Sequence, residues 1–192
     1  MTSTANRTVT ALETYTGKYV DLLNPQPETI CLADIAVGLA NTPRFAGQVS
    51  RFYSVAEHSV RVSAAIVGGG RWSLSGLFHD AHEAYTGDIT APMKQVLDLA
   101  APGIIKDLQR RLDAAIVKAF DLDIRHFKAD WLKRVDDLVM FREAAGLKYS
   151  HGIGEHWGNT EYHEPLTAYG WTPAEAERRF IETYERLTRA DA

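Results

Sequence analysis

Residues 74–85 read LSGLFHDAHEAY, and this stretch sets the expectation for the fold. Each step along an α-helix turns the side chain by about 100°. On a helix, the apolar side chains of this stretch form one stripe, made of Leu74, Leu77, Phe78, Ala81 and Tyr85. His79, Asp80 and Glu83 lie on the opposite side, where the small residue Gly76 permits close approach. This second side is either a solvated surface or the lining of a polar cavity.

Helical spacing of apolar residues continues on both sides of this stretch. Further helices are predicted over four segments that are separated by Gly or Pro, namely 32–40, 55–67, 104–120 and 129–147. A last helix, over 172–189, begins with a capping box of Thr172 and Glu175, and Pro173 occupies its first turn. The predicted fold class is therefore mostly α.

The two ends of the chain carry smaller features. β-Branched and aromatic residues over 8–22 predict a short β-hairpin within an N-terminal appendage, residues 1–30. Residues 148–171 are rich in Gly, His and Trp without periodicity, and we interpret them as a loop or lid. Since no repeat or long linker divides the sequence, we expect a single domain over residues 1–192.

The composition argues against several classes of protein. A net charge of -4 at pH 7 gives no basic field of the kind that holds nucleic acid. Cys31 is the only cysteine, so neither an intrachain disulfide nor a cysteine-based zinc site is available. No apolar run approaches the roughly 20 residues that span a bilayer. We therefore expect a cytoplasmic protein that binds neither nucleic acid nor a membrane.

Two polar residues are predicted to face inward on their helices. His58 shares a stripe with apolar residues at helical spacing, so its imidazole is either a hydrogen-bonded core group or a metal ligand. Asp136 borders the apolar stripe of its helix, whereas Asp137 lies nearly opposite and is expected to face solvent. A buried aspartate is costly unless it is paired or metal-bound. His79 and Asp80, together with His58, would supply a partner through an ion.

The context of these residues resembles the HD superfamily of metal-dependent phosphohydrolases, especially the bacterial 5'-deoxynucleotidases and their phage-encoded relatives. Three stretches carry the resemblance, namely VAEHS at 55–59, HDAHEAYTGDITAPMK at 79–94 and KRVDDL at 133–138. The resemblance implies an HD-domain helical bundle that binds a divalent metal ion through His58, His79, Asp80 and Asp136. Such a set of two imidazoles and two carboxylates suits Mn, Co, Zn, Fe or Ni better than Mg.

Two acids near the expected ion are candidates for catalysis. Glu83 follows His79 by one helical turn, so it could orient or deprotonate an attacking water. It could instead pair with a neighbouring charge on the helix surface. Asp88 follows Thr86-Gly87, where a helix is expected to end. The resemblance gives Asp88 a second acid/base role, and the alternative is an aspartate that stabilises the turn.

Substrate contacts are assigned to Arg44, Phe45 and Lys94. The two cations would compensate the charge of a transferring phosphoryl group, or else they are solvated surface charges. The bacterial nucleotidases carry an Arg-Trp pair that helps select deoxyribose, and Arg44-Phe45 is the nearest equivalent here, one residue closer to His58. Further aromatic residues could stack on a base or pack the C-terminal helix, namely Trp157, Tyr162, Tyr169 and Trp171.

These features predict an enzyme that hydrolyses deoxynucleoside 5'-monophosphates to the deoxynucleoside and phosphate. A rival reaction with the same site is removal of triphosphate from a dNTP, possibly dATP. A rival of another class is a non-catalytic helical module with a structural metal site, although such a site needs no neighbouring Glu83, Asp88 or Lys94. The expected partners are a small nucleotide substrate and further copies of the chain, as a homodimer or larger homo-oligomer.

Overall fold

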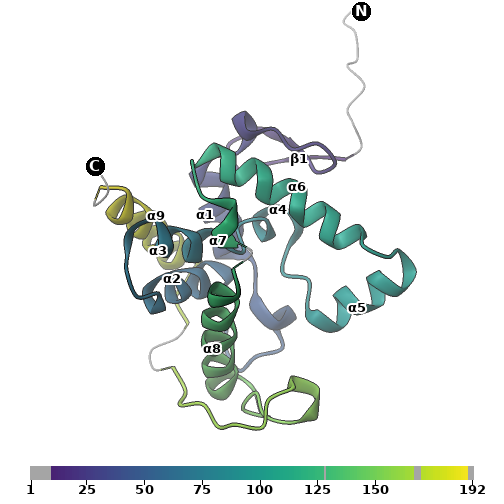
Figure 1. Ribbon diagram of the computed structural model, residues 1–192, viewed down its shortest axis with the longest axis vertical. Helices are drawn as coiled ribbons and strands as arrows, with labels where there is room; N and C mark the ends of the chain where they lie inside the picture. The colour runs from purple at the N-terminus through teal and green to yellow at the C-terminus, as the bar shows by residue number, and fades with distance from the viewer. Residues whose placement is uncertain (1–9, 128, 167–169, 190–192) are drawn as a thin grey trace, which may run out of the picture.

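The computed structural model describes residues 10–127, 129–166 and 170–189. These residues form a mostly helical protein with a two-stranded antiparallel hairpin near the N-terminus (Figure 1). The predicted fold class is confirmed in both respects. No helix in these ranges is long and apolar enough to cross a membrane.

The hairpin consists of β1 (Ala11–Glu13) and β2 (Tyr19–Asp21), so it is shorter than the predicted range of 8–22. A 3-10 helix, η1 (Pro27–Thr29), connects it to α1 (Leu32–Asn41). The buried carboxylate of Asp34 in α1 accepts hydrogen bonds from the hydroxyl groups of Thr14 and Thr16 and from the backbone N–H of Thr16. These bonds hold the appendage against the helical body.

The main core lies where α9 (Pro173–Arg189) packs against α1, α2 (Val55–Ala65) and α3 (Gly70–Phe78). Its fully buried large side chains include Ile35, Leu39, Leu77, Phe78 and Phe180. The predicted start of the last helix is also observed, because the Thr172 hydroxyl accepts a hydrogen bond from the Glu175 N–H at 3.2 Å. This core fixes α2 and α3, the elements that carry His58 and lead into His79.

The prediction of one continuous helix over 74–85 is wrong. The α3 helix ends at Phe78, residues 79–82 form a turn, and α4 covers only Glu83–Thr86. Hydrogen bonds in the turn span three residues instead of four, as in Ala81 N–H to Phe78 O at 2.9 Å and Glu83 N–H to Asp80 O at 2.9 Å. The tighter winding changes the directions of the side chains after Phe78. The 100° step of an α-helix therefore does not predict how the side chains of His79 and Glu83 lie relative to each other.

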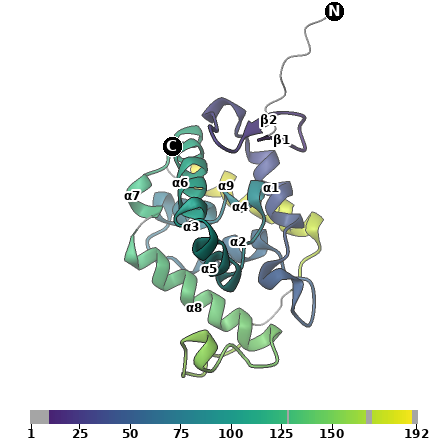
Figure 2. The same cartoon turned by 90° about the vertical axis from the view of Figure 1, so that its right-hand side faces the viewer.

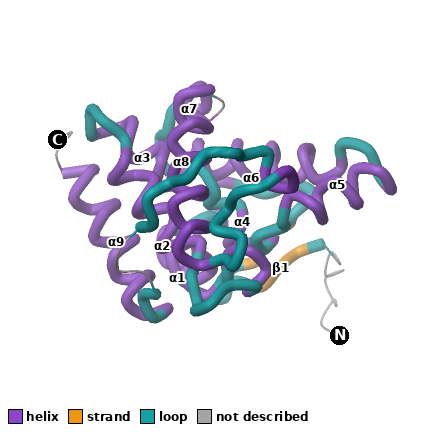
Figure 3. Tube along the Cα trace, turned by 90° about the horizontal axis from the view of Figure 1, so that it is seen from below, coloured by secondary structure: helices purple, strands orange, loops and turns teal. Residues whose placement is uncertain are grey.

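Several helices lie where none was predicted. They are η2 (Arg44–Gly47), α5 (Ala91–Ala100), α7 (Ile124–Phe127) and η3 (Glu155–Trp157). The α5 helix buries none of its residues against the described parts of the chain, and with the adjoining end of α6 (Ile104–Ala119) it extends away from the body (Figures 1 and 3). The α8 helix (Asp130–Leu147) runs along the other side of the body, and the following segment folds beneath its C-terminal end (Figure 2).

We expect Phe180→Ala to lower the free energy of unfolding by about 3–5 kcal/mol, because it removes a fully buried ring from the main core. Chemical denaturation followed by far-UV circular dichroism measures this change. Leu99→Ala is the control, since Leu99 is 87% exposed and its loss should cost less than about 0.5 kcal/mol. Equal effects of the two substitutions would contradict this assignment of the core.

Candidate metal centre

Four polar residues from three parts of the chain meet next to the main core. His58 comes from α2, His79 and Asp80 follow α3 directly, and Asp136 comes from α8. The two imidazole Nε2 atoms lie 3.2 Å apart. Asp136 Oδ1 lies 3.1 Å from Nε2 of His58, and Asp80 Oδ2 lies 3.1 Å from Nε2 of His79. We call these four residues the donor cluster.

Hydrogen bonds on the far side of each imidazole fix its tautomer. His58 Nδ1 donates to the carboxylate of Glu143 at 2.7 Å, and His79 Nδ1 donates to the carbonyl of Gly76 at 2.8 Å. In the neutral rings, both Nε2 atoms therefore carry lone pairs that point into the same space. Facing lone pairs repel one another unless a proton or a cation lies between them. The donor set thus fits a divalent metal ion.

The charges of the donor cluster also favour a bound cation. Burial opposes protonation of His79, yet the carboxylates of Asp80 and Asp136 raise its pKa well above the usual range. Burial likewise opposes ionisation of Asp80 and Asp136, but the neighbouring histidines lower the pKa of both carboxyl groups. The side chains of Asp80 and Asp136 are 19% and 30% exposed, whereas that of His58 is fully buried and that of His79 is 8% exposed. The cluster thus attracts positive charge and is open on its carboxylate side.

Glu143 is a functional residue that the sequence analysis missed. Its fully buried carboxylate accepts hydrogen bonds from Tyr53 Oη and His58 Nδ1, both at 2.7 Å, and lies 3.3 Å from Nε of Arg44. Glu143 follows Asp136 by seven residues, which is nearly two full turns of α8, so both carboxylates project from the same side of the helix. That spacing could have identified it.

Glu83 lies beside the donor cluster. Its Oε1 lies 4.0 Å from Nζ of Lys94, and its buried Oε2 has no hydrogen-bond partner among the described residues. Burial, with the charges of Asp80 and Asp88, raises the pKa of the Glu83 carboxyl to about 9. An unpartnered buried oxygen next to four converging donors is a position where a bound water or ligand would supply the missing bond.

The remaining predicted site residues lie around the same cluster. Arg44 is buried, with Nη1 3.5 Å from Asp80 Oδ2. Asp88 accepts a hydrogen bond from the backbone N–H of Phe45 at 3.1 Å. The exposed Asp137, by contrast, forms an ion pair with Lys133 at 2.9 Å and takes no part in the cluster.

The histidines outside the predicted ligand set have other contacts. His82 is buried, and it lies close enough to Asp80 and Glu83 for the three to form a second potential metal-binding group. However, the two ring nitrogens of His82 already contact Asp113 and Gln109, each at 3.0 Å. His126 stacks on Trp72, and His163 stacks on Phe141. His151 donates to the carbonyl of Ala145. Tyr169, which was considered as a stacking residue, lies outside the described residues.

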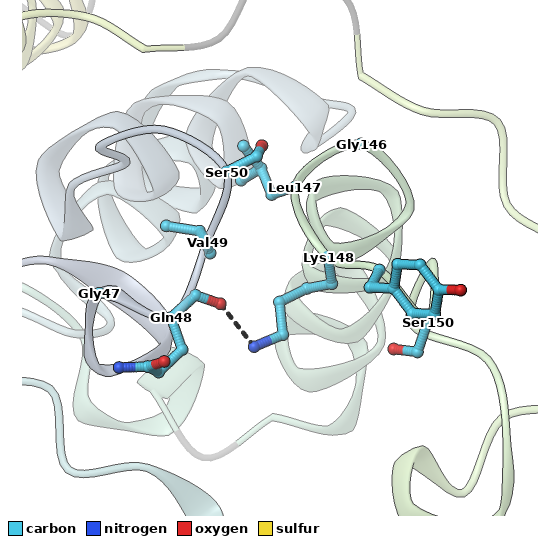
Figure 4. Close-up of a pocket in the computed structure, with 9 residues that line it drawn as sticks. Gly47, Gln48, Val49, Ser50, Gly146, Leu147, Lys148 and Ser150 are labelled. Atoms are coloured by element: carbon cyan, nitrogen blue, oxygen red, sulfur yellow. Dashed lines mark hydrogen bonds between the residues drawn. The ribbon is translucent and has the colours of Figure 1, made fainter.

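A cavity of about 470 Å³ opens beside the donor cluster. It is lined by predicted site residues, by α8 and by the segment that follows α8, including Arg44, Phe45, Asp88, Met140, Lys148 and Trp157. We call it the site cavity. A second hollow, of about 770 Å³, lies between the 47–50 loop and residues 146–150, and there Lys148 donates to the carbonyl of Gln48 at 2.7 Å (Figure 4). It contains no candidate catalytic residue.

Comparisons with known proteins show relatives but no established activity. No protein-family model matches the chain. It is 39% identical over 113 residues to the uncharacterized protein YfdR of Escherichia coli, and the match covers 58% of each protein. An uncharacterized protein of Rhodobacter capsulatus is 40% identical over 113 residues, which cover 55% of this chain and 56% of that protein. The chain thus matches these curated relatives over little more than half of their length.

We expect Glu143→Gln to weaken binding of Mn²⁺ by about 10- to 100-fold. The Glu143 carboxylate orients the His58 ring and makes its Nε2 more basic, and the substitution removes that negative charge. Isothermal titration calorimetry of the protein, freed of metal by chelation, measures this affinity. Asp137→Asn is the matched control on the same helix and should leave the affinity unchanged. The proposed role of Glu143 would be wrong if both variants bound Mn²⁺ as tightly as the unaltered protein.

Proposed function

We propose that the protein is a metal-dependent phosphohydrolase that converts deoxynucleoside 5'-monophosphates to the deoxynucleoside and phosphate. One observation carries the proposal, which is that the donor cluster lies beside an unpartnered buried acid, Glu83, and two cations, Arg44 and Lys94. A purely structural metal site requires ligands but no such surroundings. The HD-type sequence pattern through Lys94 supports a deoxynucleotide as the substrate.

His58, His79, Asp80 and Asp136 would hold the ion. When bound there, a divalent ion supplies Lewis acidity, which polarises a phosphate group and lowers the pKa of a coordinated water. Because the two carboxylates are the exposed members of the cluster, the substrate phosphate would approach from their side. The mixed nitrogen and oxygen donors favour Mn, Co, Zn, Fe or Ni over Mg.

Glu83 is assigned the proton transfers. Water attacks phosphorus, the bond between phosphorus and the 5' oxygen breaks, and the leaving oxygen takes up a proton from the Glu83 carboxyl. The resulting Glu83 carboxylate takes the proton that the attacking water gives up. The buried Glu83 carboxyl, whose pKa is raised, can hold a proton near neutral pH and pass it to the leaving oxygen. Lys94, 4.0 Å from Glu83, and Arg44, 3.5 Å from Asp80, would compensate the negative charge of the phosphoryl group.

Turnover of a panel of dNMPs, NMPs and dNTPs with added Mn²⁺, Co²⁺ or Mg²⁺ tests this function, with products identified by ion-exchange chromatography. We expect deoxynucleoside and inorganic phosphate from the dNMPs, and faster turnover with Mn²⁺ or Co²⁺ than with Mg²⁺. Release of tripolyphosphate from a dNTP would instead identify the rival reaction. Turnover of no compound in the panel would refute the proposal.

We expect Glu83→Gln to lower kcat by about 10²- to 10⁴-fold, because an amide cannot transfer the proton. Its affinity for Mn²⁺, measured by calorimetry, should stay within about twofold, since Glu83 is not assigned as a ligand. Glu182→Gln, which alters an exposed acid paired with Arg178 in α9, is the control for both measurements. Full activity of the Glu83→Gln variant would remove this residue from the mechanism.

A further inference from the structure

Two aromatic rings from distant parts of the chain meet at the site cavity. The rings of Phe45 and Trp157 have centroids 6.2 Å apart and planes tilted by 59°. Phe45 lies next to Arg44, which contacts the donor cluster, and Trp157 ends η3 in the segment after α8. The cavity is therefore lined both by this aromatic pair, which we call its aromatic end, and by Arg44, which reaches Asp80 of the donor cluster.

The backbone that presents Phe45 is strained. Phe45 and the next residue, Ala46, have φ angles of 56° and 53°, in the left-handed region. A side chain with a Cβ is disfavoured in this conformation, because the Cβ approaches the following carbonyl oxygen. The carboxylate of Asp88 holds the turn by accepting the Phe45 N–H at 3.1 Å. Strain of this kind is concentrated at functional sites, where the surrounding structure imposes it.

Trp157 is also held in place. Its indole Nε1 donates to the Ser150 hydroxyl at 3.1 Å, and η3 lies inside a small loop closed by a bridge between Gly154 and Asn159. The buried amide of Asn159 donates to the carbonyls of Gly152 and Glu161. The segment 150–161 is therefore fixed by its own hydrogen bonds, and it contributes His156 and Trp157 to the wall of the cavity.

Two cations that line the cavity, Arg44 and Lys148, already contact other groups of the protein. Arg44 lies 3.5 Å from Asp80 and 3.3 Å from Glu143, and Lys148 donates to the carbonyl of Gln48. Both also approach the Phe45 ring, with Arg44 Cζ at 5.4 Å and Lys148 Nζ at 5.6 Å from its centroid. Each of the two cations thus contacts a group of the protein besides the Phe45 ring. The Phe45 ring already has cations near it, so the indole of Trp157 is the better stacking surface.

We infer that Trp157 binds the nucleobase of the substrate by stacking, while Phe45 contacts the edge of the base. The 59° tilt prevents both rings from stacking on one flat base. With the phosphate at the donor cluster, the base reaches the aromatic end of the cavity, and residues 150–158 contribute to substrate affinity. This inference rests on the proposed function, and it assigns the aromatic end to the base instead of further phosphates.

Kinetics of Trp157→Ala and Trp157→Phe with a dNMP and with deoxyribose 5-phosphate test the role of Trp157. Stacking contributes about 1–3 kcal/mol per base, so Trp157→Ala should raise KM for the dNMP by about 5- to 150-fold with kcat within about twofold. Trp157→Phe, which keeps an aromatic ring, should have a KM for the dNMP close to that of the unaltered protein. KM for deoxyribose 5-phosphate, which lacks a base, should not change. An unchanged KM for the dNMP, or an equal rise for both substrates, would overturn the inference.

Fluorescence titration separates this inference from the proposed function, because it needs no turnover. In the Mn²⁺-loaded protein, dAMP should quench tryptophan emission, and Trp157→Phe should abolish most of the quenching. Trp72→Phe, which alters a half-exposed ring stacked on His126, should preserve it. If Trp157→Phe loses the quenching but the unaltered protein turns over no nucleotide, the proposed hydrolase function is refuted and the contact between Trp157 and the base is supported. Quenching unchanged in Trp157→Phe would refute the base contact, whatever the turnover.

Discussion

The hydrogen bond between Glu143 and His58 is the contact on which the organisation of the site depends. It joins α8 to α2 through groups that are fully buried, and Tyr53 and Arg44 complete the set around the same carboxylate. A buried charge is costly unless its partners are well placed, and removing one partner leaves the others uncompensated. The network therefore constrains how far α8 can move from the core, and with it the position of Asp136.

Negative charge dominates the surroundings of the two metal-facing imidazoles. The nearby carboxylates belong to Asp80, Glu83, Asp88, Asp136 and Glu143, and the nearby cations are Arg44 and Lys94. The surrounding carboxylates raise the pKa values of Glu83 and His79, so protons on these two groups would offset part of the negative charge. A divalent cation would offset it without protons, so metal binding should release protons from the site. The charge balance and the geometry of the donor atoms therefore both favour a divalent cation at this site.

Apolar periodicity was sufficient to predict the helical class, because each core helix buries one regular stripe. It failed after Phe78, where three-residue hydrogen bonds replace the helical ladder and no change in residue type marks the transition. It also missed α5, although Met93, Val96, Leu97 and Ala100 recur there at helical spacing, because Pro92 was interpreted as part of a connecting segment when it lies in the first turn of the helix. Within the site, helical angles placed Asp136 inward and Asp137 outward, as the structure has them. Glu143 was overlooked despite its spacing from Asp136, because its partners His58, Tyr53 and Arg44 come from other parts of the chain.

The left-handed turn at Phe45 and Ala46 has a consequence for how this chain can change over generations. Glycine adopts such angles freely, so a glycine at position 46 would relieve part of the strain and make the fold more stable. The same replacement would let the turn sample other conformations and so loosen the orientation of the neighbouring ring. Selection for thermal resistance alone would therefore favour glycine there, whereas selection for a fixed aromatic surface would favour a residue with a side chain.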